Sequence, residues 1–198
     1  MSLPKFDNYQ EEGPTDDGYE SLQDFFLSWT IRCSPDKYRK ENKKLQEYAR
    51  RIVFIMIFGN NNSDRYSIEN NFPDEFRVKE VKTKRQFKGI DLLAEVTTTY
   101  KGEENKHLLN IENKVYSSLQ PNQLKRYKSI IEEWYSGYEI SNLFITCDDC
   151  RKDYESEKIK CQENNYKYLT INCLFVLSEM DKLDKTGNEL FDEYWFVD

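Results

Sequence analysis

Two acidic residues and a lysine interrupt segments that otherwise read as regular strands. Asp91 lies within "GIDLLAEV" (89–96), and Glu112 and Lys114 lie within "LLNIENKV" (108–115). Burying a carboxylate costs free energy unless a cation or hydrogen bonds compensate its charge. A hard cation such as Mg²⁺ does so, binding one or two carboxylates together with water and phosphate oxygens. A lysine beside such an ion stabilises a negatively charged transition state, so these residues indicate phosphodiester hydrolysis.

The alternation of side chains along the two segments predicts where these three residues point. Successive side chains of a strand face opposite sides of the sheet, so Glu112 and Lys114 share a face. Asp91 lies on the face of its own segment that also holds Leu93, Glu95 and Thr97. If the two segments pair around the turn "KGEEN" (101–105), Asp91 and Glu112 project from the same face near one end.

The elements around these segments indicate a mixed α/β fold. Periodicity predicts helices over 19–31 and 41–58, strands over 76–82, 90–100 and 106–115, a helix from near Pro121 to about 135, strands over 139–147 and 166–171, and a closing helix over 172–183. The stretch between the second helix and the first strand is rich in turn-forming residues. A helix that crosses over from the third strand makes the fourth strand parallel to it.

Helical spacing of apolar residues predicts the buried faces. In the second helix the residues expected to face the core are Leu45, Tyr48, Ile52, Ile55 and Met56, and in the helix after Pro121 they are Leu124, Tyr127, Ile131 and Trp134. Ser21 with Asp24 three residues later suits a capped helix start. We expect residues 1–18 to form a flexible N-terminal arm and residues 19–198 to form a single nuclease-like domain.

The strand residues resemble the signature of the PD-(D/E)XK nuclease superfamily. Asp91 matches the acid that opens the second core strand, and Glu112-Asn113-Lys114 matches the E-x-K of the third. "FLSWTI", "GIDLL" and "IENKV…QPNQLKRY" are similar to a bacterial branch, and Gln123 with Tyr127 matches the Q-x-x-x-Y element of a related subgroup. The resemblance covers roughly residues 20–180. It implies a restriction-endonuclease-like core with N-terminal helices, a three-strand meander, a crossover helix, further parallel strands and a closing helix.

The resemblance also implies a role for each matching residue. Asp91 and Glu112 would bind Mg²⁺ or Mn²⁺, together with the main-chain carbonyl of Asn113. Lys114 would orient or deprotonate the attacking water and stabilise the phosphate in the transition state. Gln123 would steady the site from the start of its helix, and Tyr127 would contact substrate or brace Gln123.

Many members of the superfamily add an acid from the first helix or the first strand. The candidates here are Glu80 on the first strand and Glu20 or Glu47 on the helices, and Glu80 is preferred as the additional metal ligand. The literal Pro-Asp pairs at 35–36 and 73–74 stand in turn-like contexts, so neither is assigned to the site.

Charge is distributed unevenly along the chain. The net charge is −7, yet residues 32–128 hold 21 Lys/Arg against 13 Asp/Glu, and the remainder holds 8 against 23. A basic middle indicates a surface that binds a polyanion, the alternative being a solvated face that arose by chance. The basic run 77–88 predicts nucleic-acid contacts from Lys79, Lys82, Lys84, Arg85 and Lys88, with a solvated hairpin as the alternative. A second patch comprises Lys37 to Lys44 with Arg50 and Arg51.

The remaining chemistry-bearing residues are few. Five cysteines in a chain without a leader-like N-terminus or a long apolar run are typical of a cytoplasmic protein without disulfides. Cys147, Cys150 and Cys161, with Cys33 or Cys173, could imitate an iron–sulfur or zinc ligand set, but their irregular spacing argues against either. A single histidine, His107, excludes a nuclease or hydrolase built on several histidines.

The function expected from these observations is divalent-metal-dependent hydrolysis of phosphodiester bonds, in DNA rather than RNA. The alternative is a catalytically degenerate domain of the same fold that binds nucleic acid or a protein partner. No membrane partner is expected, and a homodimer is left open. Strand type, sequence specificity and endo- or exonucleolytic action are not determined by the sequence.

Overall fold

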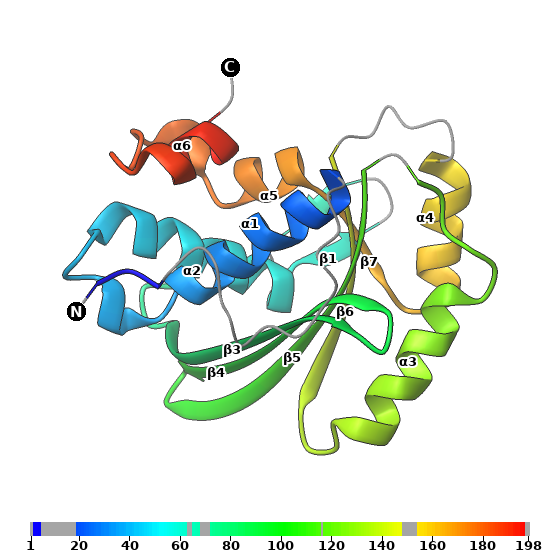
Figure 1. Cartoon of the computed structure of the whole chain (residues 1–198). Coiled ribbons are helices and arrows are strands. Elements are labelled where there is room, and N and C mark those ends of the chain that lie inside the picture. Colours follow the sequence, from blue (N-terminus) through cyan, green and yellow to red (C-terminus); the bar gives the residue numbers. More distant parts are fainter. Residues whose placement is uncertain are drawn as a thin grey trace.

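Helices cover both faces of a five-stranded sheet in the computed structural model (Figure 1), which describes residues 2–4, 19–62, 65–67, 72–115, 117–147 and 154–196. The sheet consists of β3 (Arg77–Phe87), β4 (Ile90–Tyr100), β5 (Glu103–Lys114), β6 (Glu139–Thr146) and β7 (Lys167–Thr170). The helices are α1 (Tyr19–Cys33), α2 (Lys43–Phe58), α3 (Gln123–Trp134), α4 (Tyr154–Glu163), α5 (Ile171–Leu177) and α6 (Glu189–Trp195). Short elements complete the described chain: η1 (Asp36–Tyr38), η2 (Met180–Lys182), and a separate ribbon of β1 (Asn60–Asn62) and β2 (Arg65–Ser67).

The sheet combines an antiparallel meander with parallel strands. Its order is β3-β4-β5-β6-β7, and β3, β4 and β5 pair antiparallel through short turns. The pairs β5–β6 and β6–β7 are parallel, with α3 and α4 as the crossovers. A helical crossover is required because parallel neighbours cannot be joined by a hairpin. The predicted α/β architecture, with its three-strand meander and parallel fourth strand, is confirmed.

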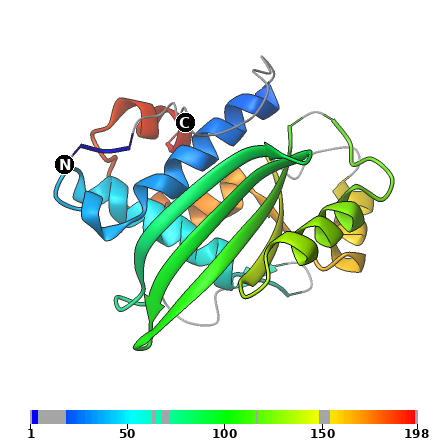
Figure 2. The ribbon, with the colours of Figure 1, turned by 60° about the horizontal axis from the view of Figure 1, so that its bottom comes forward.

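The core is divided by the sheet. On one face α1, α2, α5 and α6 pack over the inward side chains of β4, β5 and β6, while α3 and α4 lie on the opposite face (Figures 1 and 2). The residues of α2 predicted to face the core are all buried. Asn42 caps this helix, since its side chain accepts a hydrogen bond from the Leu45 amide at 3.0 Å.

Several elements differ from the sequence-based expectation. β3 continues to Phe87, and α4, α6 and the β1–β2 ribbon were not predicted. α4 has few apolar residues at helical spacing, so its periodicity was weak. α1 begins at Tyr19, and Asp24 is buried within it rather than capping it. Trp134 is 53% exposed, which contradicts its expected place among the buried residues of α3.

Two further expectations concern the chain as a whole. Of the arm predicted for residues 1–18, only residues 2–4 lie within the described part of the structure. Among the described residues, no helix combines the length and apolar character that crossing a lipid bilayer requires.

Candidate active site

Asp91 and Glu112 lie opposite each other on neighbouring strands. The register pairs Leu92 of β4 with Ile111 of β5, so the next pair toward the end of the sheet is Asp91 with Glu112. Side chains directly opposite in an antiparallel pair have Cβ atoms about 4.5–5.5 Å apart. Both carboxylates face the side of the sheet covered by α3, where two acids share one small volume.

Glu112 has one carboxylate oxygen occupied and one open. Its Oε1 accepts a hydrogen bond from Gln123 Nε2 at 2.6 Å and lies 2.6 Å from Lys114 Nζ. Its Oε2 is buried and has no hydrogen-bond partner among the described residues. Burial and the neighbouring charge of Asp91 raise the pKa of Glu112 to about 9. The side chain is completely buried, so its charge is compensated by Lys114, by a proton shared with Asp91, or by a bound cation.

Asp91 is held from three directions. The Asn113 amide donates to its Oδ2 at 2.9 Å, Gln86 Nε2 donates to its Oδ1 at 3.3 Å, and Lys114 Nζ lies 3.9 Å from Oδ2. Burial raises the pKa of Asp91, while Lys114 and the Asn113 amide act to lower it. Lys114 is therefore within ion-pair distance of both acids, and its side chain is only 9% exposed.

The start of α3 closes the site through a chain of hydrogen bonds. Gln123 accepts from the Gln120 amide at 3.1 Å and donates through Nε2 to Glu112 and, at 3.0 Å, to Tyr127 Oη. Tyr127 Oη in turn donates to the carbonyl of Gly89, in the hairpin that leads into Asp91. Burial and then the charge of Glu112 raise the pKa of Tyr127, so the phenol keeps its proton at neutral pH. The pair Gln123–Tyr127 thus links both acidic strands to α3.

Behind β5, α1 supplies two residues that sequence reasoning did not assign to the site. Asn113 faces away from the acids, accepting from Gln23 Nε2 at 2.5 Å and donating to Asp24 Oδ1 at 3.0 Å. Burial and the charge of Asp91 raise the pKa of Asp24 well above its usual range. The charges of Asp24 and Asp91 therefore act on each other across β5. The helical spacing of the apolar residues of α1 does not single out Asp24, so its contact with Asn113 comes from the structure alone.

The other acids considered from the sequence lie elsewhere. Glu80 on β3 is more than half exposed and pairs with Lys82 at 3.5 Å. Glu47 binds Arg50 at 2.6 Å and Arg51 at 3.2 Å on α2. The side chain of Glu20 lies outside the described residues. The structure therefore does not bring Glu80 or Glu47 to the acid pair.

The acid pair fits a divalent cation that takes few protein ligands. Among the described residues no group of three or more His, Cys, Asp or Glu side chains could hold a metal ion. Two opposed carboxylates with one open, buried oxygen match the Mg²⁺ pattern, in which water and substrate phosphate supply the remaining ligands. The Asn113 carbonyl stays a predicted ligand.

The basic residues of the run 77–88 divide between the two faces of the sheet. Lys84 lies on the α3 side, where its Nζ contacts Glu95 and Tyr135 Oη, each at 3.1 Å. Lys88 lies over the ring of Trp134. Arg85 is buried on the other face, stacked on Phe25 of α1. Lys79 and Lys82 are exposed, with Lys82 beside Glu80.

The second basic patch lies at the far end of β3 from the acids. A cavity there is lined by Arg39, Lys43, Lys44, Glu47, Tyr48, Arg50, Arg51, Asp74, Arg77, Leu183 and Asp184. Arg50 and Arg51 make internal ion pairs with Glu47, and Lys44 pairs with Asp184 at 3.3 Å. These cations therefore serve in part to stabilise the fold.

The cysteines expected not to form a metal–sulfur site are spread through the molecule. Cys33 and Cys161 are buried in separate apolar clusters on opposite faces of the sheet, and burial raises the pKa of both thiols. Cys147 is exposed, and Cys150 lies outside the described residues. Cys33 and Cys161 are free thiols.

Comparison with known proteins identifies a family. The model of the PD-(D/E)XK nuclease superfamily matches residues 21–186, which is most of the chain and includes every residue of the site described above. No curated protein and no solved structure matches the chain.

Proposed function

The chain belongs to the PD-(D/E)XK nuclease superfamily, and from that premise we propose that it is a divalent-metal-dependent nuclease acting on DNA. The observation that carries the proposal is the cross-strand pair of Asp91 and Glu112, which share Lys114 and leave Glu112 Oε2 open. A buried pair of acids is costly unless something compensates its charge. Its cost is understandable where the acids hold a cation.

In this proposal each residue has a defined task. Asp91 and Glu112, with the Asn113 carbonyl, hold Mg²⁺ or Mn²⁺. When bound, the cation polarises the scissile phosphate and lowers the pKa of a bound water. Lys114 has three N–H groups, so while contacting the acids it can also donate to the attacking water or a phosphate oxygen. Gln123 and Tyr127 keep Glu112 and the β3–β4 hairpin in register, so the acids stay opposed.

The proposal is tested with single- and double-stranded DNA and with RNA of the same sequence, each with Mg²⁺, Mn²⁺ or EDTA. Wild-type protein is expected to cleave DNA only with metal. Glu112→Gln and Lys114→Ala are expected to lower kcat about a hundredfold or more, because each removes charge stabilisation at the reacting phosphate.

Glu80→Gln is the matched control, since it neutralises an exposed acid of the same sheet and is expected to retain activity. Loss of activity in Glu80→Gln would indicate that the metal site lies nearer to Glu80 on β3 than proposed. Cleavage that persists in both site variants would contradict the assignment. Binding of DNA by the wild type without any cleavage would favour the degenerate, binding-only domain.

The proposed compartment is the cytoplasm, where reducing conditions keep thiols free.

A further inference from the structure

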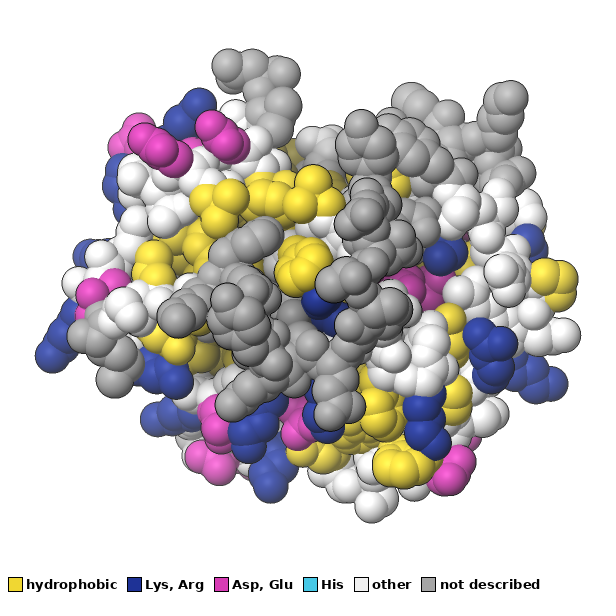
Figure 3. Space-filling view, in the orientation of Figure 1, with side chains coloured by type: hydrophobic (Ala, Val, Ile, Leu, Met, Phe, Trp, Pro, Cys, Tyr) yellow, Lys and Arg dark blue, Asp and Glu magenta, His cyan; other side chains and the backbone are white. Residues whose placement is uncertain are grey.

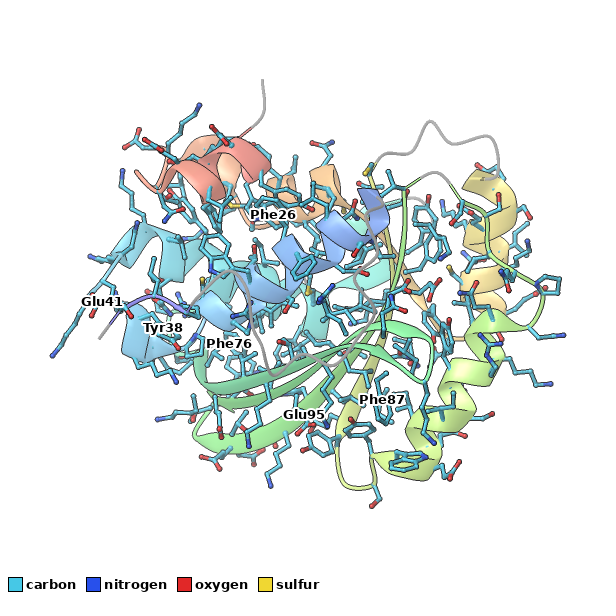
Figure 4. All side chains as sticks on the ribbon, viewed as in Figure 1. Phe26, Tyr38, Glu41, Phe76, Phe87 and Glu95 are labelled. Atoms are coloured by element: carbon cyan, nitrogen blue, oxygen red, sulfur yellow. The ribbon has the colours of Figure 1, made fainter. Side chains whose placement is uncertain are left out.

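An exposed tryptophan stands at the end of α3, beside the β3–β4 hairpin. Trp134 is 53% exposed, its ring lies 5.8 Å from that of Phe87 in an edge-to-face contact, and Lys88 Nζ lies 3.8 Å from its ring centre. Together with Lys84 and Tyr135, whose ring lies 6.2 Å from Phe87, these residues form what we call the aromatic–basic platform. Phe87 lies between the sheet and α3 (Figure 4), and Figure 3 shows hydrophobic and basic side chains side by side in this region.

The platform lies in line with the candidate active site. Trp134 follows Tyr127 by seven positions and Gln123 by eleven, so all three lie along one stripe of α3. At 1.5 Å per residue, Trp134 is about 10 Å along the helix from Tyr127. The β3–β4 hairpin contacts both of these residues of α3. The Gly89 carbonyl accepts a hydrogen bond from Tyr127, and Phe87 and Lys88 contact the ring of Trp134.

Packing of the core does not explain the exposed surface of Trp134. The junction between α3 and the hairpin is already filled by Ile90, Leu93, Leu108, Tyr127, Ile131 and Tyr135, all buried, with Phe87, Ile130 and Tyr138 against them. Trp134 is not among the residues that fill this junction. Contact with Phe87 nevertheless restricts the indole, so a large aromatic surface is presented to solvent in a defined orientation.

We propose that Trp134 stacks on a nucleobase of the substrate, within about three nucleotides of the scissile phosphate. This rests on the proposed nuclease function. The distance of about 10 Å between Tyr127 and Trp134 spans roughly three nucleotides when successive bases are stacked 3.4 Å apart. Lys88 contributes positive charge for an adjoining phosphate, and its exposed cation–π contact with Trp134 is weak enough to exchange for that phosphate. Lys84 is already paired with Glu95 at 3.1 Å, so it serves mainly to hold the platform together. Aromatic stacking between bases and a charged groove is a recurrent way to bind single strands.

The proposal defines a substrate class. A base pair inside a duplex is covered on both sides by its neighbours, so its bases offer no open face to an indole. A base that stacks on Trp134 is therefore unpaired or terminal. The structure thus assigns the site to single-stranded DNA, or to duplexes with a frayed end or an overhang, rather than to continuous duplex.

Tryptophan fluorescence reports this contact directly. Trp29 and Trp195 are 3% and 4% exposed, so Trp134 is the tryptophan that a ligand can reach. The experiment titrates Glu112→Gln protein, in Mg²⁺, with a fluorophore-labelled single strand of about ten nucleotides, within the usual site sizes. A second strand has the same length and charge but abasic sugars. The third probe is a much longer continuous duplex, in which almost every base is internal. Binding is measured by anisotropy of the label, and stacking by quenching of tryptophan emission.

We expect the base-containing strand to quench emission saturably and to bind about tenfold more tightly than the abasic strand and the duplex. Trp134→Leu should lower affinity for the base-containing strand about tenfold and leave the abasic strand unchanged, whereas Trp134→Phe, which still stacks, should retain most of it. Ile159→Ala, at an equally exposed apolar residue of α4, is the control and should change neither. Thermal melts verify that each variant is folded.

The outcomes separate this inference from the proposed function. Equal binding of base-containing and abasic strands, or binding without quenching, would overturn stacking even if the wild type cleaves DNA. If the wild type shows quenching and base-dependent binding but never cleaves DNA, the stacking role of Trp134 stands and the proposed nuclease activity is wrong. Absence of binding to every strand would overturn both.

Discussion

The buried carboxyl of Glu112 is tolerated only when it is protonated or paired with a cation. Its pKa is raised from the usual 4.5 to about 9 by burial and by Asp91, so the metal-free native state holds it protonated at neutral pH. A raised carboxyl pKa contributes stability that is fully present below about pH 4.5 and is lost as pH rises toward 9. The metal-free protein should therefore become less stable across this window.

Glu112→Gln should remove this dependence, because the amide cannot ionise. We expect the metal-free variant to melt about 10 °C or more above wild type at pH 8 and at nearly the same temperature at pH 5, at about 2–4 °C per kcal/mol. Differential scanning calorimetry with EDTA at both pH values measures the effect. Glu80→Gln, at an exposed position, is the control. Equal shifts at both pH values would contradict a protonated native Glu112.

At the scale of elements, the β3–β4 hairpin links the acids to α3. Gly89 has φ +84° and accepts the Tyr127 hydroxyl, two residues before Asp91. A side chain in this left-handed region costs about 1–2 kcal/mol. The hairpin conformation and the position of Asp91 are therefore coupled through a residue that only glycine suits.

Gly89→Ala and Gly102→Ala form a matched pair. Gly102, in the β4–β5 hairpin at the far end of the sheet, has φ +81° and open space around an added Cβ. Both variants should lose about 1–2 kcal/mol of unfolding free energy in urea. Only Gly89→Ala should also lower kcat, by about tenfold or more, because it moves Asp91 relative to Glu112. Equal activities would mean that the hairpin does not position the acid.

At the scale of the whole molecule, the charged side chains are distributed unevenly over the surface. The chain carries −7, yet basic side chains gather both at the platform and at the cavity near the start of β3. β3 is eleven residues long, so these two regions are separated by about 35 Å. That distance exceeds the screening length of about 8 Å at physiological salt, so each region acts locally.

Charge reversal at the two regions should therefore have different effects. Lys88→Glu and Lys43→Glu change the net charge equally, and both side chains are exposed. Lys88→Glu is expected to weaken binding of single-stranded DNA about tenfold and to reduce its salt dependence by about one phosphate contact. Lys43→Glu should change neither, which anisotropy titrations at several salt concentrations measure. Equal losses would show that substrate extends to the cavity, or that only total charge matters.

The sequence by itself determined the elements whose signals are local. Alternation along 90–97 and 108–115 placed Asp91, Glu112 and Lys114 on one face, and the spacing of Gln123 and Tyr127 placed both on one side of a helix. The α/β class and the meander followed from the order of helices and strands. Period-two and period-3.6 patterns are properties of a few consecutive residues, and they survive folding because each element buries one face.

Only the tertiary structure decided which distant residues meet. It brought Asp24 and Gln23 of α1 behind Asn113, left Glu80 and Glu47 with basic partners of their own, and separated Arg85 from Lys84 across the sheet. It also exposed Trp134, although its spacing matches that of buried neighbours. The physical reason is that strand register, helix docking and helix length set these contacts over dozens of residues. The periodicity of a sequence segment predicts which face is buried, but it does not show which other element packs against that face.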